Sequence, residues 1–137
     1  MSLLFQKLSK KIPAWREEVK NLQKEHGEKV ISQVTVTQAY GGMRGVKSLV
    51  CDTSAVPPDK GLIIRGKPVR ELEDKLPEEV LWLLLTGELP TAEELKDLQA
   101  DLAKRSKLPG YVLDVLKAMP ADSHPLVMFN TGILVME

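Results

Sequence analysis

A cluster of glycines in the first half of the chain constrains the local fold most strongly. Residues 40–45 read Tyr-Gly-Gly-Met-Arg-Gly, so three glycines lie within five residues and flank Arg44. Glycine costs backbone entropy on folding, and such clusters mark tight turns, positive φ angles or a close approach of the backbone to another group. The stretch therefore predicts a turn, and a basic side chain on such a turn is well placed to meet a phosphate or a carboxylate.

Helical patterns lie on both sides of this turn. Apolar residues recur at helical spacing over residues 3–22, where Pro13 can start or kink a helix and Gly27 is a natural stop. Later in the chain, Pro68 can open a short helix that runs to residue 72. Pro77 suits the first position of an apolar helix that ends at Gly87.

Two further helices are predicted before the last segment. Residues 91–94 read Thr-Ala-Glu-Glu, a capping box that predicts a helix start and precedes an apolar stripe on residues 95, 98 and 102. Pro109 is expected to open the next helix, with Leu113 and Leu116 facing inward, and Pro120 is expected to close it.

The apolar period changes between the first and the later helices. Residues 30–40 alternate between apolar and polar side chains, which predicts an extended segment. Residues 49–51 and 62–64 are short apolar pieces on either side of a turn-rich stretch, and they are expected to pair as a small ribbon. The predicted fold class is therefore mainly α, with a small β ribbon near residues 30–66.

The last segment, residues 126–136, is apolar on nearly every side and follows Pro125. A helix of this kind must be buried by neighbours. It runs up to the final residue, Glu137, without a cap, which leads us to expect a sequence that stops within an element. No repeat or linker divides residues 1–137, so we expect them to be one segment of a larger helical domain.

Charge and cysteine content exclude some classes of partner. Lysine plus arginine and aspartate plus glutamate number 19 each, and the resulting zero net charge argues against nucleic acid or an anionic membrane as a general partner. No apolar run approaches the roughly 20 residues that span a bilayer. The single cysteine, Cys51, allows no intrachain disulfide and fits a reducing compartment. The basic, amphipathic start is better explained as a native first helix than as a mitochondrial presequence.

Few residues are candidates for chemistry. His26 is expected at a helix end, where a cation favours the helix dipole, and His124 is expected to bond locally at a helix start. Cys51 lies in an apolar run and is interpreted as a buried, inert thiol. Nucleophile, metal-ligand and cofactor motifs are absent, so we predict no catalytic residue, no metal and no cofactor. For Arg44, a surface arginine on a turn is the simpler interpretation from the residues alone.

The order of motifs along nearly the whole chain closely resembles the amino-terminal part of citrate synthases of the type found in mitochondria and some bacteria. The matching features are His26-Gly27, residues 34–36 (Val-Thr-Val), the glycine turn at 40–45, residues 61–66 (Gly-Leu-Ile-Ile-Arg-Gly), 76–79 (Leu-Pro-Glu-Glu), 82–87 (Trp-Leu-Leu-Leu-Thr-Gly), Pro90-Thr91, 103–105 (Ala-Lys-Arg), Leu108-Pro109 and His124-Pro125.

This resemblance implies a reaction in which acetyl-coenzyme A loses a methyl proton and attacks the ketone of oxaloacetate. It also implies that Arg44 holds the phosphates of coenzyme A across a homodimer, which makes Arg44 the predicted coenzyme A-binding residue. Arg65 matches a family arginine, for which a structural ion pair is the preferred interpretation. The family's catalytic histidines, aspartate and arginines come from later sequence, so this chain alone is expected to be inactive. The resemblance further implies a mitochondrial matrix location in a eukaryote, or a cytoplasmic one in a bacterium.

Two alternatives stay open at this point. One is a methylcitrate synthase or a related acyl-coenzyme A condensing enzyme, because the residues that choose the acyl chain lie outside this segment. The other is a non-catalytic interaction module that binds a synthase protomer through its apolar last helix. The reading frame after Glu137 distinguishes an enzyme fragment from the module, since a continuation with histidine and arginine site motifs favours the enzyme and an immediate natural stop favours the module.

Overall fold

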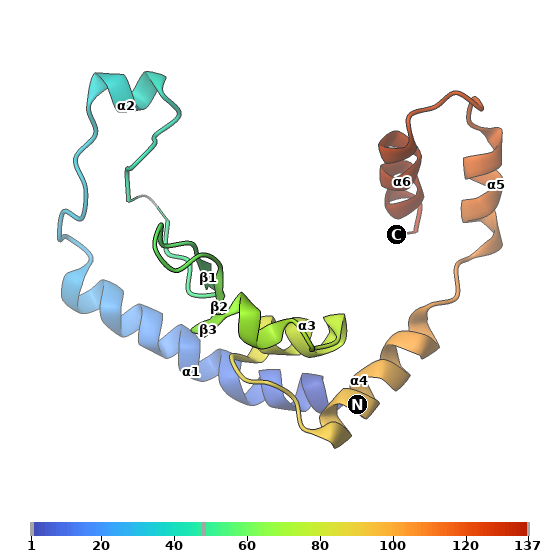
Figure 1. The fold of residues 1–137 in the computed structure, drawn as a ribbon, viewed down its shortest axis with the longest axis horizontal. Helices are drawn as coiled ribbons and strands as arrows, with labels where there is room; N and C mark the ends of the chain where they lie inside the picture. Colours follow the sequence, from blue (N-terminus) through green and yellow to red (C-terminus); the bar gives the residue numbers. More distant parts are fainter. Residues whose placement is uncertain (1, 48, 137) are drawn as a thin grey trace. The chain divides into compact units, whose positions relative to one another are not determined.

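The computed structural model describes residues 2–47 and 49–136 of the chain. The chain divides into two compact units, a first unit of Met1–Gln99 and a second unit of Ala100–Glu137, and each is described by itself. In the described residues, helices dominate and the only strands form one small antiparallel sheet (Figure 1). The predicted mainly α fold class is confirmed.

The first helix, α1 (Leu3–His26), is continuous through Pro13. Its start is capped by the Ser2 hydroxyl, which accepts a hydrogen bond from the amide of Phe5 at 3.4 Å. Its end is closed by the amide of Gly27, which donates to the carbonyl of Gln23 at 2.8 Å. The predicted stop at Gly27 is confirmed, and Pro13 does not open a separate helix.

The prediction of an extended segment over residues 30–40 is wrong for its second half, where α2 (Val36–Tyr40) is a short helix. Thr35 and Gln38 form a capping box. The amide of Gln38 donates to Thr35 Oγ1 at 3.2 Å, and the amide of Thr35 donates to Gln38 Oε1 at 3.0 Å. These local bonds offer the backbone a helical turn, and no strand of the described chain pairs with the alternating residues to favour extension.

The sheet consists of β1 (Ser54–Ala55), β2 (Ile63–Ile64) and β3 (Lys67–Pro68) in that order, all antiparallel. Ser54 pairs with Ile64, so the strand before the turn-rich stretch begins three residues after the predicted piece at 49–51 ends. That part of the ribbon prediction is wrong. Residues 49–51 are exposed, and their apolar side chains gain no burial that would favour a strand there.

A small core lies where the sheet leads into the next helices. A 3₁₀ turn, η1 (Val69–Leu72), follows β3, and α3 (Pro77–Thr86) begins at Pro77 as predicted. Leu72 is buried, Trp82 and Leu83 are fully buried, and α1 packs against α3. Gly87 ends α3 with a φ of 85°, a left-handed conformation that suits glycine.

Helix α4 (Ala92–Arg105) begins at the predicted capping box. The amide of Glu94 donates to Thr91 Oγ1 at 3.2 Å, and the amide of Thr91 donates to Glu94 Oε2 at 2.8 Å. Leu98 is the buried member of the predicted apolar stripe. The amide of Leu3 donates to Asp97 Oδ2 at 2.7 Å, so the start of α1 is tied to α4 within the first unit.

The second unit contains α5 (Gly110–Ala118) and α6 (Pro125–Leu134), which pack against each other. Val112 is buried, whereas Leu113 is 48% exposed, so the prediction that Leu113 faces inward is wrong. Val112 and Leu116 are four residues apart and share the face that meets α6, and Leu113 is turned away from it. The buried Gly132 faces Leu116, since a Cβ at this position would lie 3.6 Å from Leu116 Cδ1, an ordinary van der Waals distance.

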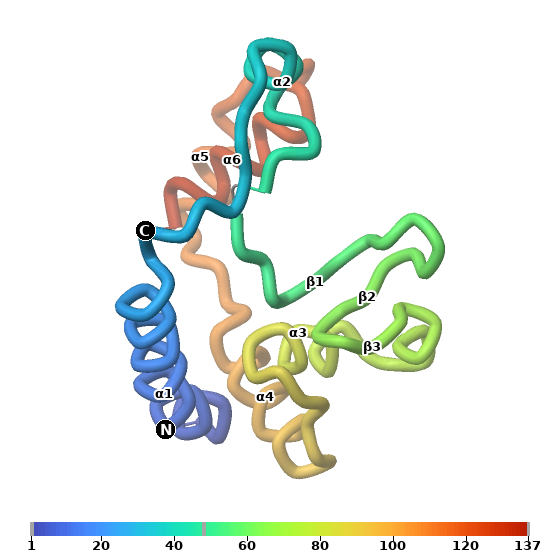
Figure 2. The backbone as a smooth tube through the Cα atoms, turned by 90° about the vertical axis from the view of Figure 1, so that its left-hand side faces the viewer, coloured from blue at the N-terminus to red at the C-terminus, as the bar shows by residue number. Residues whose placement is uncertain are grey.

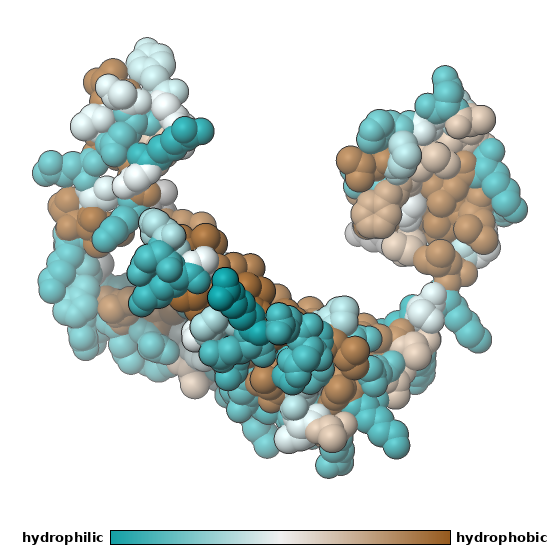
Figure 3. Space-filling view, viewed as in Figure 1, coloured by the Kyte–Doolittle hydropathy of each residue, from teal (hydrophilic) through white to brown (hydrophobic). Residues whose placement is uncertain are grey.

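Much apolar surface stays open on this second unit. Leu126, Phe129 and Leu134 of α6 are 63%, 63% and 75% exposed. Leu108, Val112, Leu116, Met128, Phe129, Gly132, Ile133 and Met136 line one apolar groove. Figure 3 shows apolar side chains gathered on the α5–α6 unit. None of the described helices combines the length and the apolar character that a membrane span needs.

Candidate functional site

Arg44 lies on a tight turn directly after α2, as its flanking glycines predict. Met43 has a φ of 62°, and Gly42 and Gly45 have φ angles of 73° and 76°. The amide of Met43 donates to the carbonyl of Gln38 at 2.7 Å, and the amide of Val46 donates to the carbonyl of Met43 at 3.1 Å. Glycine suits Gly42 and Gly45 because a residue with a Cβ is strained at these left-handed angles, although a Cβ at Gly42 would meet nothing within 4 Å.

Gln38 links this turn to the capping box of α2. Its Nε2 donates to the carbonyl of Arg44 at 3.4 Å, while its Oε1 accepts from the amide of Thr35. One side chain therefore holds both the start of α2 and the backbone of the residue that carries the guanidinium. Figures 1 and 2 both show α2 away from α1 and from the sheet of the first unit.

The Arg44 side chain is exposed, and its guanidinium has no hydrogen bond or ion pair with any other described residue. A guanidinium presents several N–H donors in a planar fork that matches phosphate and carboxylate oxygens. Lys47, three residues further on, is also exposed. The turn thus offers a guanidinium fork that no other described residue engages, on a backbone held by hydrogen bonds, and this is the chemistry of an anion contact.

Arg65, the other arginine of the glycine-rich stretch, is engaged in structural contacts. Its Nε and Nη2 donate to the carbonyl of Leu84 at 3.0 and 2.8 Å, and its Nη1 donates to Asp52 Oδ2 at 3.0 Å. Only 16% of its side chain is exposed. The interpretation of Arg65 as a structural ion pair is confirmed.

The two histidines lie at helix ends, as predicted. His26 is in the last turn of α1, and its Nε2 lies 3.9 Å from Glu25 Oε2. His124 precedes α6, where its Nδ1 accepts a hydrogen bond from the amide of Leu126 at 3.2 Å. Both side chains therefore make local contacts at the ends of their own helices.

Cys51 is exposed, so the prediction of a buried thiol is wrong. Its neighbours Leu49 and Val50 are themselves 87% and 88% exposed, and the apolar run is not a core segment. Hydrogen bonding to Thr53, and then to Ser54, lowers the pKa of the thiol to about 7. The signal that sequence reasoning missed is this pair of hydroxyl residues just after the cysteine.

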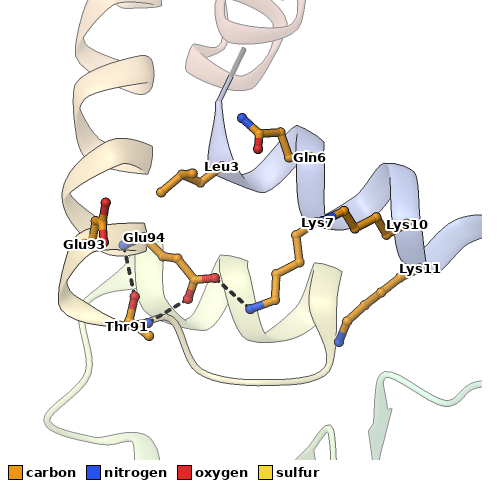
Figure 4. A pocket seen from close by; sticks show the side chains of 8 residues that line it. All are labelled: Leu3, Gln6, Lys7, Lys10, Lys11, Thr91, Glu93 and Glu94. Carbon is orange, nitrogen blue, oxygen red and sulfur yellow. Dashed lines mark hydrogen bonds and ion pairs between the residues drawn. The ribbon is translucent and has the colours of Figure 1, made fainter.

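An open pocket of charged residues lies between the start of α1 and the start of α4 (Figure 4). Lys7 Nζ lies 2.7 Å from Glu94 Oε1 and 3.2 Å from Glu88 Oε1, and Lys11 Nζ lies 2.7 Å from Glu88 Oε1. Lys7 Nζ also lies 5.4 Å from the centroid of the Trp82 ring. The ion pairs join residues more than 70 positions apart, which sequence spacing does not reveal.

These ion pairs shift the pKa values of the groups involved. The hydrogen bond to Glu94 raises the pKa of Lys7 above its usual range. Hydrogen bonds from Lys11 and then Lys7 lower the pKa of Glu88. Both lysines are therefore already neutralised by carboxylates, and the pocket is better explained as an ion-pair cluster that joins α1 to the chain around α3 and α4 than as an anion site. Among the described residues, no group of three histidine, cysteine, aspartate or glutamate side chains is placed to hold a metal ion.

Comparison with known proteins gives a consistent result. The family model described as "Citrate synthase, C-terminal domain" matches residues 42–137. The chain is 42% identical to the mitochondrial citrate synthase of Saccharomyces cerevisiae and 40% identical to that of Aspergillus niger, over 98% of this chain and 30% of each relative. It is 36% identical to the peroxisomal citrate synthase of S. cerevisiae, over 98% of this chain and 31% of that relative.

The chain thus spans about 30% of the length of the curated relatives it matches. The family model, in turn, covers well over half of this chain and begins inside the glycine turn, before Arg44. With identities of 40% and more over nearly all of its residues, the chain belongs to the citrate synthase family.

Proposed function

We propose that this chain is the amino-terminal segment of a citrate synthase and that Arg44 is its contribution to the active enzyme, as a contact for the phosphates of coenzyme A. The observation that carries the proposal is that no other described residue engages the guanidinium of Arg44, which lies on a turn held by backbone hydrogen bonds in a chain of this family. The other family-matched arginine, Arg65, is already engaged by Leu84 and Asp52. Arg44 is therefore the one of the two with donors to spare.

The proposed reaction condenses acetyl-coenzyme A with oxaloacetate and releases citrate and coenzyme A. It needs a general base for the methyl proton, a donor for the enol oxygen, and cations that bind a dicarboxylate. In the described part of this chain, both histidines lie at helix ends, where His26 meets only its exposed neighbour Glu25 and His124 accepts a hydrogen bond from the amide of Leu126. The catalytic groups are expected to come from other parts of the complete protein, and Arg44 is expected to act in binding alone.

The local structure suits Arg44 to a binding role. The backbone of the turn is held by hydrogen bonds from Met43 and Gln38, so few backbone conformations need to be given up when a ligand binds. No contact of the guanidinium has to break before a ligand binds, because Arg44 has no side-chain partner among the described residues. A phosphate would gain two parallel N–H···O bonds from one side chain.

We further propose a homodimer, supported by the apolar groove and exposed α6 side chains of the second unit. Apolar surface of this extent is typical of a surface that a partner covers. Light scattering of the purified chain over a dilution series is the test. A monomer at every concentration would count against the homodimer. Because the relatives include mitochondrial enzymes, we propose a mitochondrial matrix location if the source is a eukaryote. A cytoplasmic location in a bacterium stays an expectation from the resemblance.

The experiment that tests the Arg44 proposal is steady-state kinetics on the complete enzyme. Arg44→Ala is expected to raise the KM for acetyl-coenzyme A by about tenfold or more, since a charge-assisted contact contributes about 1.5–3 kcal/mol before allowance for exposure. Arg44→Lys should recover only part of the loss, because an ammonium cannot form the fork. Lys47→Ala is the matched control, as it removes an exposed cation from the same segment.

The KM for oxaloacetate should stay the same in all three variants. An unchanged KM for acetyl-coenzyme A in Arg44→Ala, or an equal loss with both substrates, would show that Arg44 is a surface arginine without this role. Propionyl-coenzyme A belongs in the same assay, because a strong preference for it would identify the parent enzyme as a methylcitrate synthase.

A further inference from the structure

Arg65 joins the stretch after the Arg44 turn to the packed part of the first unit. We propose that Arg65 and Asp52 form a clamp that positions Arg44 for coenzyme A, so that Arg65 is a positioning residue for substrate binding. The inference rests on the proposed function, and it assigns a role to a contact that is otherwise merely structural.

The side chain of Arg65 bridges two parts of the chain. On one side, its Nε and Nη2 both donate to the carbonyl of Leu84, in the last turn of α3. On the other side, its Nη1 donates to Asp52 Oδ2 at 3.0 Å and to the carbonyl of Asp52 at 3.4 Å. All three guanidinium nitrogens are thus engaged, and a lysine could not reproduce this arrangement.

The contact with Leu84 meets a need of the helix end. Carbonyls in the last turn of a helix lack the amide partner four residues later. Here the amide of Glu88 is directed to Thr86 Oγ1 at 3.4 Å, and Arg65 supplies donors for Leu84 instead. Because Trp82, Leu83 and Thr86 of the same helix are buried, the clamp is anchored on a helix that is packed into the core of the unit.

The backbone of Arg65 holds the same segment as its side chain. Its amide donates to the carbonyl of Thr53 at 2.8 Å, next to the pairing of Ser54 with Ile64. Arg65 adopts a φ of 47°, a left-handed angle that is unfavourable for a residue with a Cβ. Such angles persist where surrounding contacts hold the residue in place. Here the contacts are the backbone hydrogen bond to Thr53 and the side-chain hydrogen bonds to Leu84 and Asp52.

The segment that carries Arg44 has few other attachments. In the described part of the chain, the hydrogen bonds of residues 30–51 run within that segment or from Cys51 to Thr53 and Ser54. Asp52 is the first residue after the turn that is joined to α3 through Arg65, and it follows Arg44 by eight positions. The clamp therefore sets where this segment returns to the core and limits the conformations open to the turn.

The test uses the complete enzyme and begins with Asp52, which is 80% exposed in its side chain and can be changed without opening the core. Asp52→Ala is expected to raise the KM for acetyl-coenzyme A by about two- to fivefold, the range expected for an exposed ion pair, with kcat and the KM for oxaloacetate unchanged. Asp52→Glu should keep the KM for acetyl-coenzyme A at the wild-type value. Arg65→Lys should raise this KM by more than Asp52→Ala does. Asp59→Ala, an exposed carboxylate between β1 and β2, is the matched control.

A double-mutant cycle separates positioning from general stabilisation. If the clamp acts through Arg44, Asp52→Ala should have no further effect in an Arg44→Ala background. An equal rise in both backgrounds, or a fall in kcat with an unchanged KM, would overturn the clamp. If Arg44→Ala raises the KM while Asp52→Ala does not, the clamp fails and the function of Arg44 stands. If Arg44→Ala has no effect, the proposed function fails, and the clamp fails with it.

Hydrogen exchange gives a second measurement that does not depend on activity. The amides of α2 and of the turn after it are expected to exchange faster in Asp52→Ala than in the wild type or in Asp59→Ala. Equal exchange in all three proteins would show that Asp52 does not restrain the turn and would overturn the proposal.

Discussion

The two basic regions of the first unit differ in what their cations contact. Lys7 and Lys11 lie in the ion-pair cluster beside the buried Trp82, where each is paired with a carboxylate at 2.7 Å. Arg44 lies on an exposed turn and has no such pair among the described residues. Charge alone does not indicate a ligand site, because cations that are already neutralised inside a unit serve stability, whereas a free guanidinium on an ordered turn is available for binding.

The largest expected effect concerns activity. The isolated 137-residue chain should show no citrate synthase activity, because neither region supplies a base together with an electrophile for enolisation. A thiol-release assay with acetyl-coenzyme A and oxaloacetate on the purified chain is the measurement. Turnover that follows the chain through every purification step would contradict the assignment of both regions to non-catalytic roles.

The next prediction compares the stability of the two regions. Trp82→Ala should lower the free energy of unfolding by about 3–5 kcal/mol, because it removes a fully buried aromatic side chain. Tyr40→Ala is the matched aromatic control in the turn region, where Tyr40 is 91% exposed, and it should change stability by less than about 0.5 kcal/mol. Denaturant unfolding measures both, and similar losses would mean that the turn region is packed like the core.

Several elements were predictable from sequence because local chemistry determines them. Thr91 and Glu94 carry their capping box within four residues, and Gly87 supplies the left-handed helix end by itself. The turn at Arg44 followed from its glycines in the same way. Such signals depend on neighbours in sequence and need no knowledge of the tertiary fold.

The errors arose where local signals compete or where partners are distant. The capping box of Thr35 and Gln38 outweighed the alternating pattern that predicted extension up to residue 40. Cys51 was predicted to be buried because its neighbours are apolar, yet those neighbours gain no covering element among the described residues. The pairing of Lys7 with Glu94 depends on how α1 lies against α3 and α4, which no short pattern encodes.

The smallest effect is the pH dependence of stability that arises in the ion-pair cluster. Hydrogen bonds from Lys11 and Lys7 lower the pKa of Glu88 in the folded chain below its ordinary value of 4.5. The ion pairs of Glu88 with Lys11 and Lys7 therefore stabilise the fold fully at a pH above 4.5. This stabilisation is lost as the pH falls through the lower pKa of Glu88 in the folded chain. Since the Glu88 side chain is half exposed, the contribution should stay below about 1 kcal/mol.

Unfolding measured between pH 7 and pH 3 tests this prediction. Glu88→Gln should remove part of the acid-dependent loss, whereas Asp59→Asn, which changes an exposed carboxylate outside the cluster, should leave the profile unchanged. Identical profiles for wild type and Glu88→Gln would show that the cluster does not contribute.

The most direct test of the central claim compares coenzyme A with pantetheine, which lacks the phosphates together with the adenosine that they join. In the complete enzyme, Arg44→Ala should weaken binding of coenzyme A by about tenfold or more, as judged by titration calorimetry. The same variant should bind pantetheine, which lacks the phosphates, as well as the wild type does. Equal weakening for both ligands, or no weakening for either, would contradict the assignment of Arg44 to the phosphates of coenzyme A.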